Sequence, residues 1–151
     1  MRWIRLLYRF SGFLLLSVIA AIDFTLRKGQ AKGVQLSTYR AEWLHRYAKK
    51  VLLILNVELE CSGEFPPTPL YVANHLSYLD IFVLSASRPV FFVSKDDVRN
   101  WPWGGILANM AGTLYIKRNV RSDLPRITAE VVEAHKAGVP IVIFPEGTTT
   151  D

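Results

Sequence analysis

Cysteine and histidine are scarce in this 151-residue sequence, and their scarcity argues against several kinds of site. Cys61 is the only cysteine, so no disulfide can form within the chain, and nothing beside it marks it as a nucleophile. His45 and His135 have no partners at the spacing of metal ligands, so we expect no zinc or other metal site. No Gly-x-Ser-x-Gly motif is present, which argues against covalent catalysis by a serine.

The sequence also lacks internal repeats, low-complexity linkers and any recognised nucleic-acid-binding motif. Its formal net charge is +5 and its isoelectric point is about 9.5, while half of its residues (50%) are hydrophobic. A basic balance favours anionic partners. Together with this hydrophobic content, it leads us to expect anionic lipid rather than nucleic acid as the partner.

A hydrophobic run long enough to cross a bilayer is absent as well. The uncharged stretch 11–22 spans about 18 Å as a helix, less than the roughly 30 Å of a hydrocarbon core. Basic residues flank it on both sides: Arg2, Arg5, Arg9, Arg27, Lys28 and Lys32. Positive charge opposes translocation, so a helix lying in or dipping into the cytoplasmic leaflet fits better than a single crossing. A signal peptide with small residues at Ala20 and Ala21 is the alternative.

A second helix is expected from about Thr38 to Leu55. Its apolar residues follow helical spacing, and basic residues supply the charge between them. Such a helix either faces the membrane or packs on a sheet. We therefore divide the chain into a membrane-associated helical region, residues 1–55, and an α/β domain, residues 56–151.

The segment Asn74–Asp80 places a histidine and a carboxylate between two apolar runs. On one helix, five residues turn the chain by about 500°, which leaves the two side chains roughly 140° apart. His75 is therefore expected on a loop after a strand, and Asp80 in the first turn of the next helix, with Ser77 as its N-cap. An imidazole held by a carboxylate can remove a proton from a hydroxyl. The plainer interpretation is a helix cap beside a polar loop histidine.

Two later segments add candidate binding groups at strand ends. Residues 112–118 predict a glycine turn and a short strand that ends in a basic pair suited to a phosphate. Residues 139–144 predict a buried strand, followed by a turn at 145–150 that carries a carboxylate, backbone amides and hydroxyls. Open α/β sheets bind ligands at this end of their strands. An ordinary strand and an ordinary turn are the plainer interpretations.

The rest of the sequence alternates between strand-like and helical patterns. Further strands are expected at 56–61, 70–73 and 90–94, and helices at 78–85, 101–111 and 122–136, the last ended by Gly138. Trp101 and Trp103 could be interfacial anchors or core residues. The pattern predicts an α/β fold, with a mixed sheet flanked by helices and an N-terminal membrane-associated helical segment.

These motifs, in this order, resemble those of the glycerolipid acyltransferase family, whose best-known members act on 1-acylglycerol-3-phosphate. His75 and Asp80 match the family's Asn-His-x-Ser-x-x-Asp motif, which implies that the histidine is the general base and the aspartate its partner. Gly112 and Arg118 match the Gly-x-x-Phe-Ile-x-Arg motif, in which Tyr115 replaces the usual aromatic residue, phenylalanine. The resemblance implies that Arg118 binds the phosphate of the acceptor.

The third motif of the family, Phe-Pro-Glu-Gly-Thr, is matched from Phe144 onward. The resemblance implies that Glu146, Gly147 and Thr148 shape the site of the acceptor. Thr149 and Thr150 replace the common Arg-Ser ending, so a contact from that arginine is not expected here. Family members continue beyond this motif, so we expect the chain to lack later parts of the domain at its C-terminus.

The resemblance implies an enzyme of phospholipid synthesis at the cytoplasmic face of the inner membrane. It would move a fatty acyl group from acyl-CoA or acyl carrier protein to the free hydroxyl of lysophosphatidate, a lysophospholipid, without a cofactor. The alternatives are an acyltransferase for another acceptor, such as lyso-ornithine lipid, glycerol-3-phosphate or another lysophospholipid, and a non-catalytic lipid-binding membrane protein.

Overall fold

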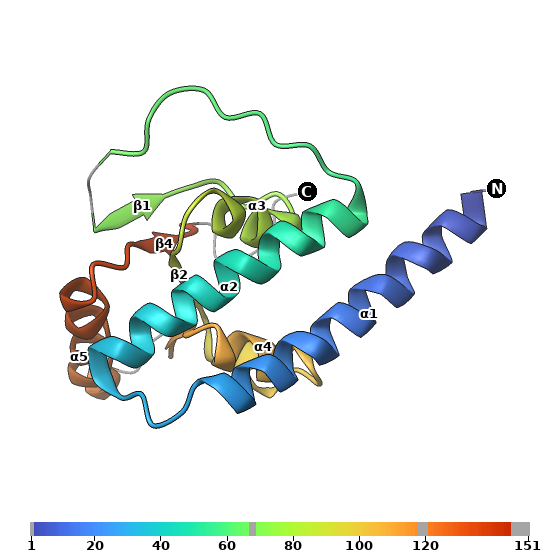
Figure 1. Cartoon of the computed structure of the whole chain (residues 1–151). Helices are drawn as coiled ribbons and strands as arrows, with labels where there is room; N and C mark the ends of the chain where they lie inside the picture. Colours follow the sequence, from blue (N-terminus) through green and yellow to red (C-terminus); the bar gives the residue numbers. More distant parts are fainter. Residues whose placement is uncertain (1, 67–68, 118–120, 146–151) are drawn as a thin grey trace.

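A parallel four-stranded sheet with helices packed around it forms the centre of the computed structural model, which describes residues 2–66, 69–117 and 121–145 (Figure 1). In these ranges the elements are α1 (Arg2–Arg27), α2 (Gly33–Leu55), β1 (Leu70–Val72), α3 (Leu79–Ser87), β2 (Phe91–Lys95), η1 (Asp96–Asn100), α4 (Gly104–Met110), β3 (Leu114–Ile116), η2 (Arg121–Asp123), α5 (Leu124–Lys136) and β4 (Ile141–Ile143).

The strand order is β1-β4-β2-β3, and all three pairings are parallel. The α/β class predicted from the sequence is confirmed, although the sheet of the described residues is parallel rather than mixed. Because the strands are parallel, their carboxyl ends share one edge. His75 follows β1 at that edge, Phe144 follows β4, Lys95 ends β2, and Lys117 follows β3.

The two faces of the sheet carry different core clusters, as the two-residue period of a strand requires. On β2 and β4, Phe91 and Ile141 pack with Ala134 of α5 and with Ala41 of α2. Phe92 and Val142, together with Val90 just before β2, pack on the other face with side chains of α2 and α3. Helices therefore cover both faces, which is the usual environment of a parallel sheet.

The strand predicted at 56–61 is wrong. Asn56 adopts a left-handed conformation (φ 55°) that ends α2, and the N–H of Val57 bonds to the carbonyl of Leu52 at 2.9 Å. Glu58, Leu59 and Glu60 then lie exposed in a loop over the surface (Figure 1). The alternation of apolar and charged residues imitates a strand, but no described strand pairs with this segment.

The other predicted elements are found with shifted ends. The helix expected at 78–85 runs from Leu79 to Ser87, and α4 begins at Gly104, after both tryptophans. Gly138 ends α5 as expected, with φ +67° and an N–H bonded to the carbonyl of His135. The short helix η1 between β2 and α4 was not predicted.

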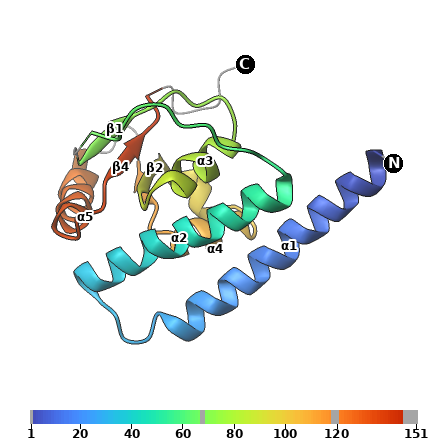
Figure 2. The same cartoon turned by 45° about the horizontal axis from the view of Figure 1, so that its top comes forward.

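The first two helices form a hairpin beside the sheet (Figures 1 and 2). Trp43, Tyr47, Ala48, Val51 and Leu52 of α2 are buried, so this helix packs on the domain rather than facing a membrane. Helix α1 is 26 residues long, about 39 Å, because it extends in both directions beyond the uncharged stretch seen in the sequence. By length and composition it could cross a membrane. Its N-terminal end projects beyond the domain in both views.

Helix α1 has two distinct faces. One face carries Gly12, Ala20 and Asp23 toward the domain: a Cβ on Gly12 would lie 3.2 Å from Ile54, and Ala20 is buried. Arg2, Arg5 and Arg9 continue this face by the same helical spacing. The remaining surface exposes large apolar side chains along its whole length: Trp3, Ile4, Leu6, Leu7, Phe10, Leu14, Leu15, Val18, Ile19, Ile22 and Leu26.

Gly112, singled out in the sequence as a site residue, has a structural role at the start of β3. Its backbone has φ +79°, and a Cβ there would lie only 2.5 Å from Cε1 of the buried Phe91. Gly138 has a similar left-handed backbone, but a Cβ there would meet nothing within 4 Å. Alanine variants of Gly112 and Gly138 therefore separate two contributions to the loss of stability: the strain of a left-handed backbone, which both variants share, and the clash with Phe91, which only the variant at Gly112 has.

Gly112→Ala is therefore expected to destabilise the fold more than Gly138→Ala. Both variants should lose about 1–2 kcal/mol from the left-handed backbone. Gly112→Ala should lose a further 1–3 kcal/mol, roughly, because Phe91 must move. Urea unfolding of the two variants and the wild type measures the difference. Equal destabilisation of both would contradict the clash at Phe91.

Candidate active site

His75 and Asp80 meet at the carboxyl edge of the sheet. Nδ1 of His75 lies 3.1 Å from Oδ2 of Asp80, and 12% of the imidazole side chain and 27% of the carboxylate side chain are exposed. His75 lies on the loop after β1, and Asp80 lies in the first turn of α3. The spacing argument from the sequence is confirmed: a loop histidine and a helical aspartate come together where one continuous helix would separate them.

The same carboxylate oxygen organises the loop between the two residues. Oδ2 of Asp80 also accepts hydrogen bonds from the N–H of Leu76 at 2.8 Å and from the N–H of Ser77 at 2.9 Å. Oγ of Ser77 accepts the N–H of Leu79 at 3.0 Å. Ser77 and Asp80 thus form the reciprocal capping contacts expected from the sequence, although the assigned helix begins at Leu79 with Tyr78 before it.

These contacts set the charge of the pair. Partial burial on its own raises the pKa of Asp80, but the hydrogen bonds from Ser77, Leu76 and His75 lower it below its ordinary value of 3.8. Asp80 is therefore a carboxylate at neutral pH. An ionised carboxylate at Nδ1 favours the tautomer that carries its proton on Nδ1, so Nε2 is the nitrogen that would accept a proton from a substrate.

Aromatic rings surround the imidazole. Phe144, which follows β4, stacks on it with the ring centroids 4.2 Å apart and an angle of 19° between the planes. Tyr78 meets it edge-on at 6.3 Å, and Trp101 in turn meets Tyr78 edge-on at 5.8 Å. The imidazole is thus held by one carboxylate within its plane and by an aromatic ring against its face.

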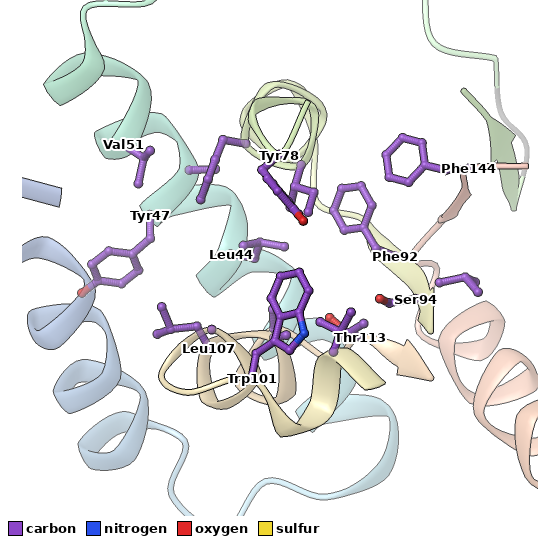
Figure 3. Close-up of a pocket in the computed structure, with 18 of the residues that line it drawn as sticks. Leu44, Tyr47, Val51, Tyr78, Phe92, Ser94, Trp101, Leu107, Thr113 and Phe144 are labelled. Atoms are coloured by element: carbon purple, nitrogen blue, oxygen red, sulfur yellow. The ribbon is translucent and has the colours of Figure 1, made fainter. Parts of the chain in front are cut away.

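A cavity of about 630 Å³ opens beside these rings, within the size range of small-molecule sites. Its walls are almost wholly apolar and include His75 itself. Figure 3 shows Phe144 and Ser94 toward one side of the cavity and Tyr47 and Val51 toward the other, near the ribbon of α1. The cavity therefore extends from the His75–Asp80 pair toward the N-terminal helices.

Helix α1 forms part of that cavity, since Phe13, Leu16, Ser17 and Ala20 line it. Two indole groups fasten the helix there. Nε1 of Trp43 donates to the carbonyl of Ala20 at 3.1 Å, and Nε1 of Trp103 donates to Oγ of Ser17 at 2.9 Å. The segment that resembled a signal peptide is thus built into the fold, with Ala20 in its core.

The structure describes only some of the predicted site residues. His75 and Asp80 are brought together at the carboxyl edge of the sheet. Gly112 precedes the amino end of β3 and therefore lies at the other end of that strand. The predicted ligands Arg118, Glu146, Gly147 and Thr148 lie outside the described residues. Their described neighbours Lys117 and Pro145 follow β3 and β4, whose carboxyl ends share the edge with His75.

Three contributors to the site were missed from the sequence: the ring of Phe144 against His75, Tyr78 with Trp101 at the cavity wall, and the α1–α2 hairpin as the far wall. The apolar spacing of α2 was visible in the sequence, but not the surface it covers. Trp101 and Trp103 are half-exposed and line or fasten the cavity, which neither interpretation from the sequence described.

A metal centre finds no support among the described residues, in which no three His, Cys, Asp or Glu side chains gather. His45 is engaged elsewhere, with its Nδ1 2.6 Å from the carbonyl of Ser85. Asp96 forms ion pairs with Arg99 at 3.6 Å and Lys117 at 4.0 Å. The described residues bring a histidine–aspartate pair and an apolar cavity together at this edge.

A parallel α/β fold with such a pair and cavity is suited to acyl transfer, and the comparisons with known proteins agree. A family model described as Acyltransferase matches residues 59–151, and the chain belongs to this family. No solved structure matches the chain.

The lyso-ornithine lipid O-acyltransferase of Pseudomonas aeruginosa is 38% identical over 95% of this chain and 55% of its own length. The 1-acyl-sn-glycerol-3-phosphate acyltransferase of Neisseria meningitidis is 39% identical over 66% of this chain and 40% of its own length. The lyso-ornithine lipid O-acyltransferase of Rhizobium meliloti is 32% identical over 89% of this chain and 47% of its own length. The chain thus spans about half the length of these relatives.

Replacing Asp80 should change how stability depends on pH. Because its pKa is lower in the folded state, its charge stabilises the fold fully above pH about 4, and this contribution is lost as the pH falls through the folded-state pKa. The difference in unfolding free energy between wild type and Asp80→Asn should therefore be steady between about pH 5 and 7 and shrink below about pH 4. Urea unfolding across this pH range measures it.

Asp97→Asn is the matched control, because Asp97 is an exposed carboxylate in the neighbouring η1 helix. The free energy of unfolding of Asp97→Asn should stay close to that of the wild type at every pH measured. A wild-type advantage over Asp80→Asn that persists undiminished at pH about 2 would contradict the role of the Asp80 charge.

Proposed function

We propose that this protein transfers a fatty acyl group from a thioester to the free hydroxyl of a lysolipid at a membrane surface. The observation that carries the proposal is the His75–Asp80 pair at the wall of a large apolar cavity. The pair supplies a base for a hydroxyl, and the cavity supplies room for a hydrocarbon chain. Membership of the acyltransferase family supports the reaction class.

In the proposed reaction, Nε2 of His75 takes the proton of the acceptor hydroxyl as its oxygen attacks the thioester carbonyl. A new carbon–oxygen ester bond forms, the carbon–sulfur bond breaks, and the thiolate leaves and takes up the proton from the imidazolium. Asp80 holds the imidazole through Nδ1 and stabilises its cation. General-base assistance of this kind contributes about 10²- to 10⁴-fold to the rate.

The apolar cavity would hold the acyl chain. It begins at His75 and Phe144 and reaches the buried side of the α1–α2 hairpin at Tyr47 and Val51. A chain lying there would present its thioester at the polar edge, where Lys95 and Ser94 also line the cavity. Holding both reactants in register at this edge supplies the part of the acceleration that comes from orientation.

The exposed apolar face of α1 supports a position in one leaflet rather than a crossing. A crossing helix is surrounded by lipid over roughly 30 Å. The inner face of α1 is covered instead by the domain, through Gly12, Ala20 and Phe24. Its basic residues at either end suit anionic headgroups, as expected for an interfacial helix on the cytoplasmic leaflet.

The relatives favour two acceptors. Lysophosphatidate agrees with the name of the Neisseria meningitidis relative and with a basic pair after β3. Lyso-ornithine lipid is the second candidate, because the Pseudomonas aeruginosa relative with that name matches 95% of the chain. The two headgroups differ in chemistry, since the first carries a phosphate and the second carries amino-acid groups. Acyl-CoA and acyl carrier protein are the donors proposed with either acceptor.

His75→Ala should abolish acyl transfer while leaving binding to anionic vesicles within about 2-fold of wild type. The base is lost, but α1 and its exposed face are untouched. Transfer of a labelled acyl group from acyl-CoA or acyl carrier protein to each lysolipid, together with vesicle co-sedimentation, measures both. Retained turnover in His75→Ala would refute the base assignment, and an inactive wild type that still binds lysolipid would favour the lipid-binding alternative.

Arg118→Ala should distinguish the acceptors. If lysophosphatidate is the substrate, losing charge-assisted hydrogen bonds to the phosphate should raise its KM by about 10- to 10²-fold with little change in kcat. Lys117→Ala is the control, because Lys117 already pairs with Asp96, and it should change the KM by about 3-fold at most. An unchanged KM for lysophosphatidate in Arg118→Ala, with faster wild-type turnover of lyso-ornithine lipid, would favour the second acceptor.

A further inference from the structure

We propose that Phe144 is a positioning residue for the catalytic histidine, holding the plane of the His75 imidazole by stacking. This inference rests on the proposed function, because it assigns a role to the base of that reaction. The sequence resemblance associates the motif that begins at Phe144 with the acceptor. The geometry associates its first side chain with the base instead.

The contact is close and nearly parallel. The ring centroids of Phe144 and His75 are 4.2 Å apart, and the planes differ by 19°. Phe92 stacks in turn on Phe144, with centroids 5.8 Å apart and planes 14° from parallel. Phe144 is therefore supported by a buried residue of β2 and is itself partly exposed at the cavity wall. The Phe144 ring thus lies between the imidazole of His75 and the ring of Phe92, which supports it.

Parallel pairing of β1 and β4 creates this contact. Val72 is in register with Ile143, and the N–H of Ala73 bonds to the carbonyl of Ile143 at 3.2 Å. The residues that follow the two strands are thereby delivered side by side at one edge. The stack is thus a consequence of strand order, and a slip in the β1–β4 register would remove it.

The carboxylate and the aromatic ring act on the imidazole in different directions. The hydrogen bond at Nδ1 acts within the plane of the imidazole, whereas the stack acts on its face and opposes tilting of that plane. A misplacement of about 1 Å at a reacting group can lower a rate about 10²-fold, so the second restraint matters for the proton transfer.

Stacking also acts on charge. When His75 takes the acceptor proton, its ring becomes a cation over the face of Phe144, well within the roughly 6 Å at which an aromatic ring attracts a cation. Asp80 and Tyr78 also contact the imidazole, the first by a hydrogen bond and the second edge-on. Phe144 adds its attraction for the cation without adding a competing base.

The test compares Phe144→Leu, Phe144→Tyr and Phe92→Leu in the natural protein that carries this sequence. Leucine keeps an apolar side chain but removes the ring, and tyrosine keeps the ring. Phe92→Leu keeps Phe144 but removes the ring that supports it from behind. Initial rates over both substrate concentrations give kcat and KM, and carbon-13-labelled histidine allows the ring resonances of His75 to be observed by NMR.

We expect kcat to fall by about 10- to 10²-fold in Phe144→Leu, with both KM values within about 2-fold of wild type. Phe144→Tyr should recover most of the rate. Phe92→Leu should lower kcat by a smaller factor than Phe144→Leu, because it removes only the ring that supports Phe144, and it should raise the KM of the acyl donor, because it alters the cavity wall. The ring protons of His75 should resonate upfield of those of the exposed His135 and move downfield most in Phe144→Leu.

Two results would overturn the inference: wild-type kcat in Phe144→Leu, or ring protons of His75 that resonate where those of His135 do in the wild-type protein. The second observation needs no variant, so it holds even if Phe144→Leu does not fold. It also separates this inference from the proposed function. A protein with the upfield shift but no transferase activity would refute the proposed function, whereas activity without the shift would refute only the role of Phe144.

Discussion

The parallel pairing of β1 with β4 is the constraint on which the candidate site depends. These strands are far apart in the sequence, yet their register places the loop that carries His75 beside the end of the strand that carries Phe144. The sheet order β1-β4-β2-β3 then adds the ends of β2 and β3 to the same edge. The carboxyl ends of the strands bring different groups to this edge: an imidazole after β1, an aromatic ring after β4, and a lysine each at the ends of β2 and β3.

Within that frame, one carboxylate oxygen of Asp80 does the local organising. It accepts two backbone N–H groups of the loop as well as Nδ1 of His75, so the loop conformation and the imidazole tautomer depend on the same charge. The cap of α3 and the His75–Asp80 pair are therefore one structure. The helix cap and the proposed catalytic role do not compete, because the capping acid is the same acid that contacts the imidazole.

Sequence reasoning was most successful where contacts are local. The separation of His75 from the helix of Asp80 and the end of α5 at Gly138 follow from residues a few positions apart, and both are confirmed. It failed at 56–61, where alternating residues suggested a strand that has no partner in the described sheet. Strand order, and with it the stack of Phe144 on His75, depends on long-range pairing that no local pattern encodes. The length of α1 was underestimated because only its uncharged stretch was counted, whereas the helix also includes charged residues on both sides of that stretch.

Helix α1 links the reaction to its proposed location. Its inner face supplies Phe13, Leu16 and Ala20 to the cavity, while its outer face exposes apolar side chains along its length. Hydrogen bonds from the indole N–H groups of Trp43 and Trp103 fix α1 against the domain. The helix therefore cannot move away without opening the wall of the cavity. If a hydrocarbon chain occupies the cavity, as proposed, then the surface proposed to contact lipid and the wall that would contact the bound chain are opposite sides of one helix. The proposed lipid surface and the site would then lie one helix diameter apart, roughly 10 Å.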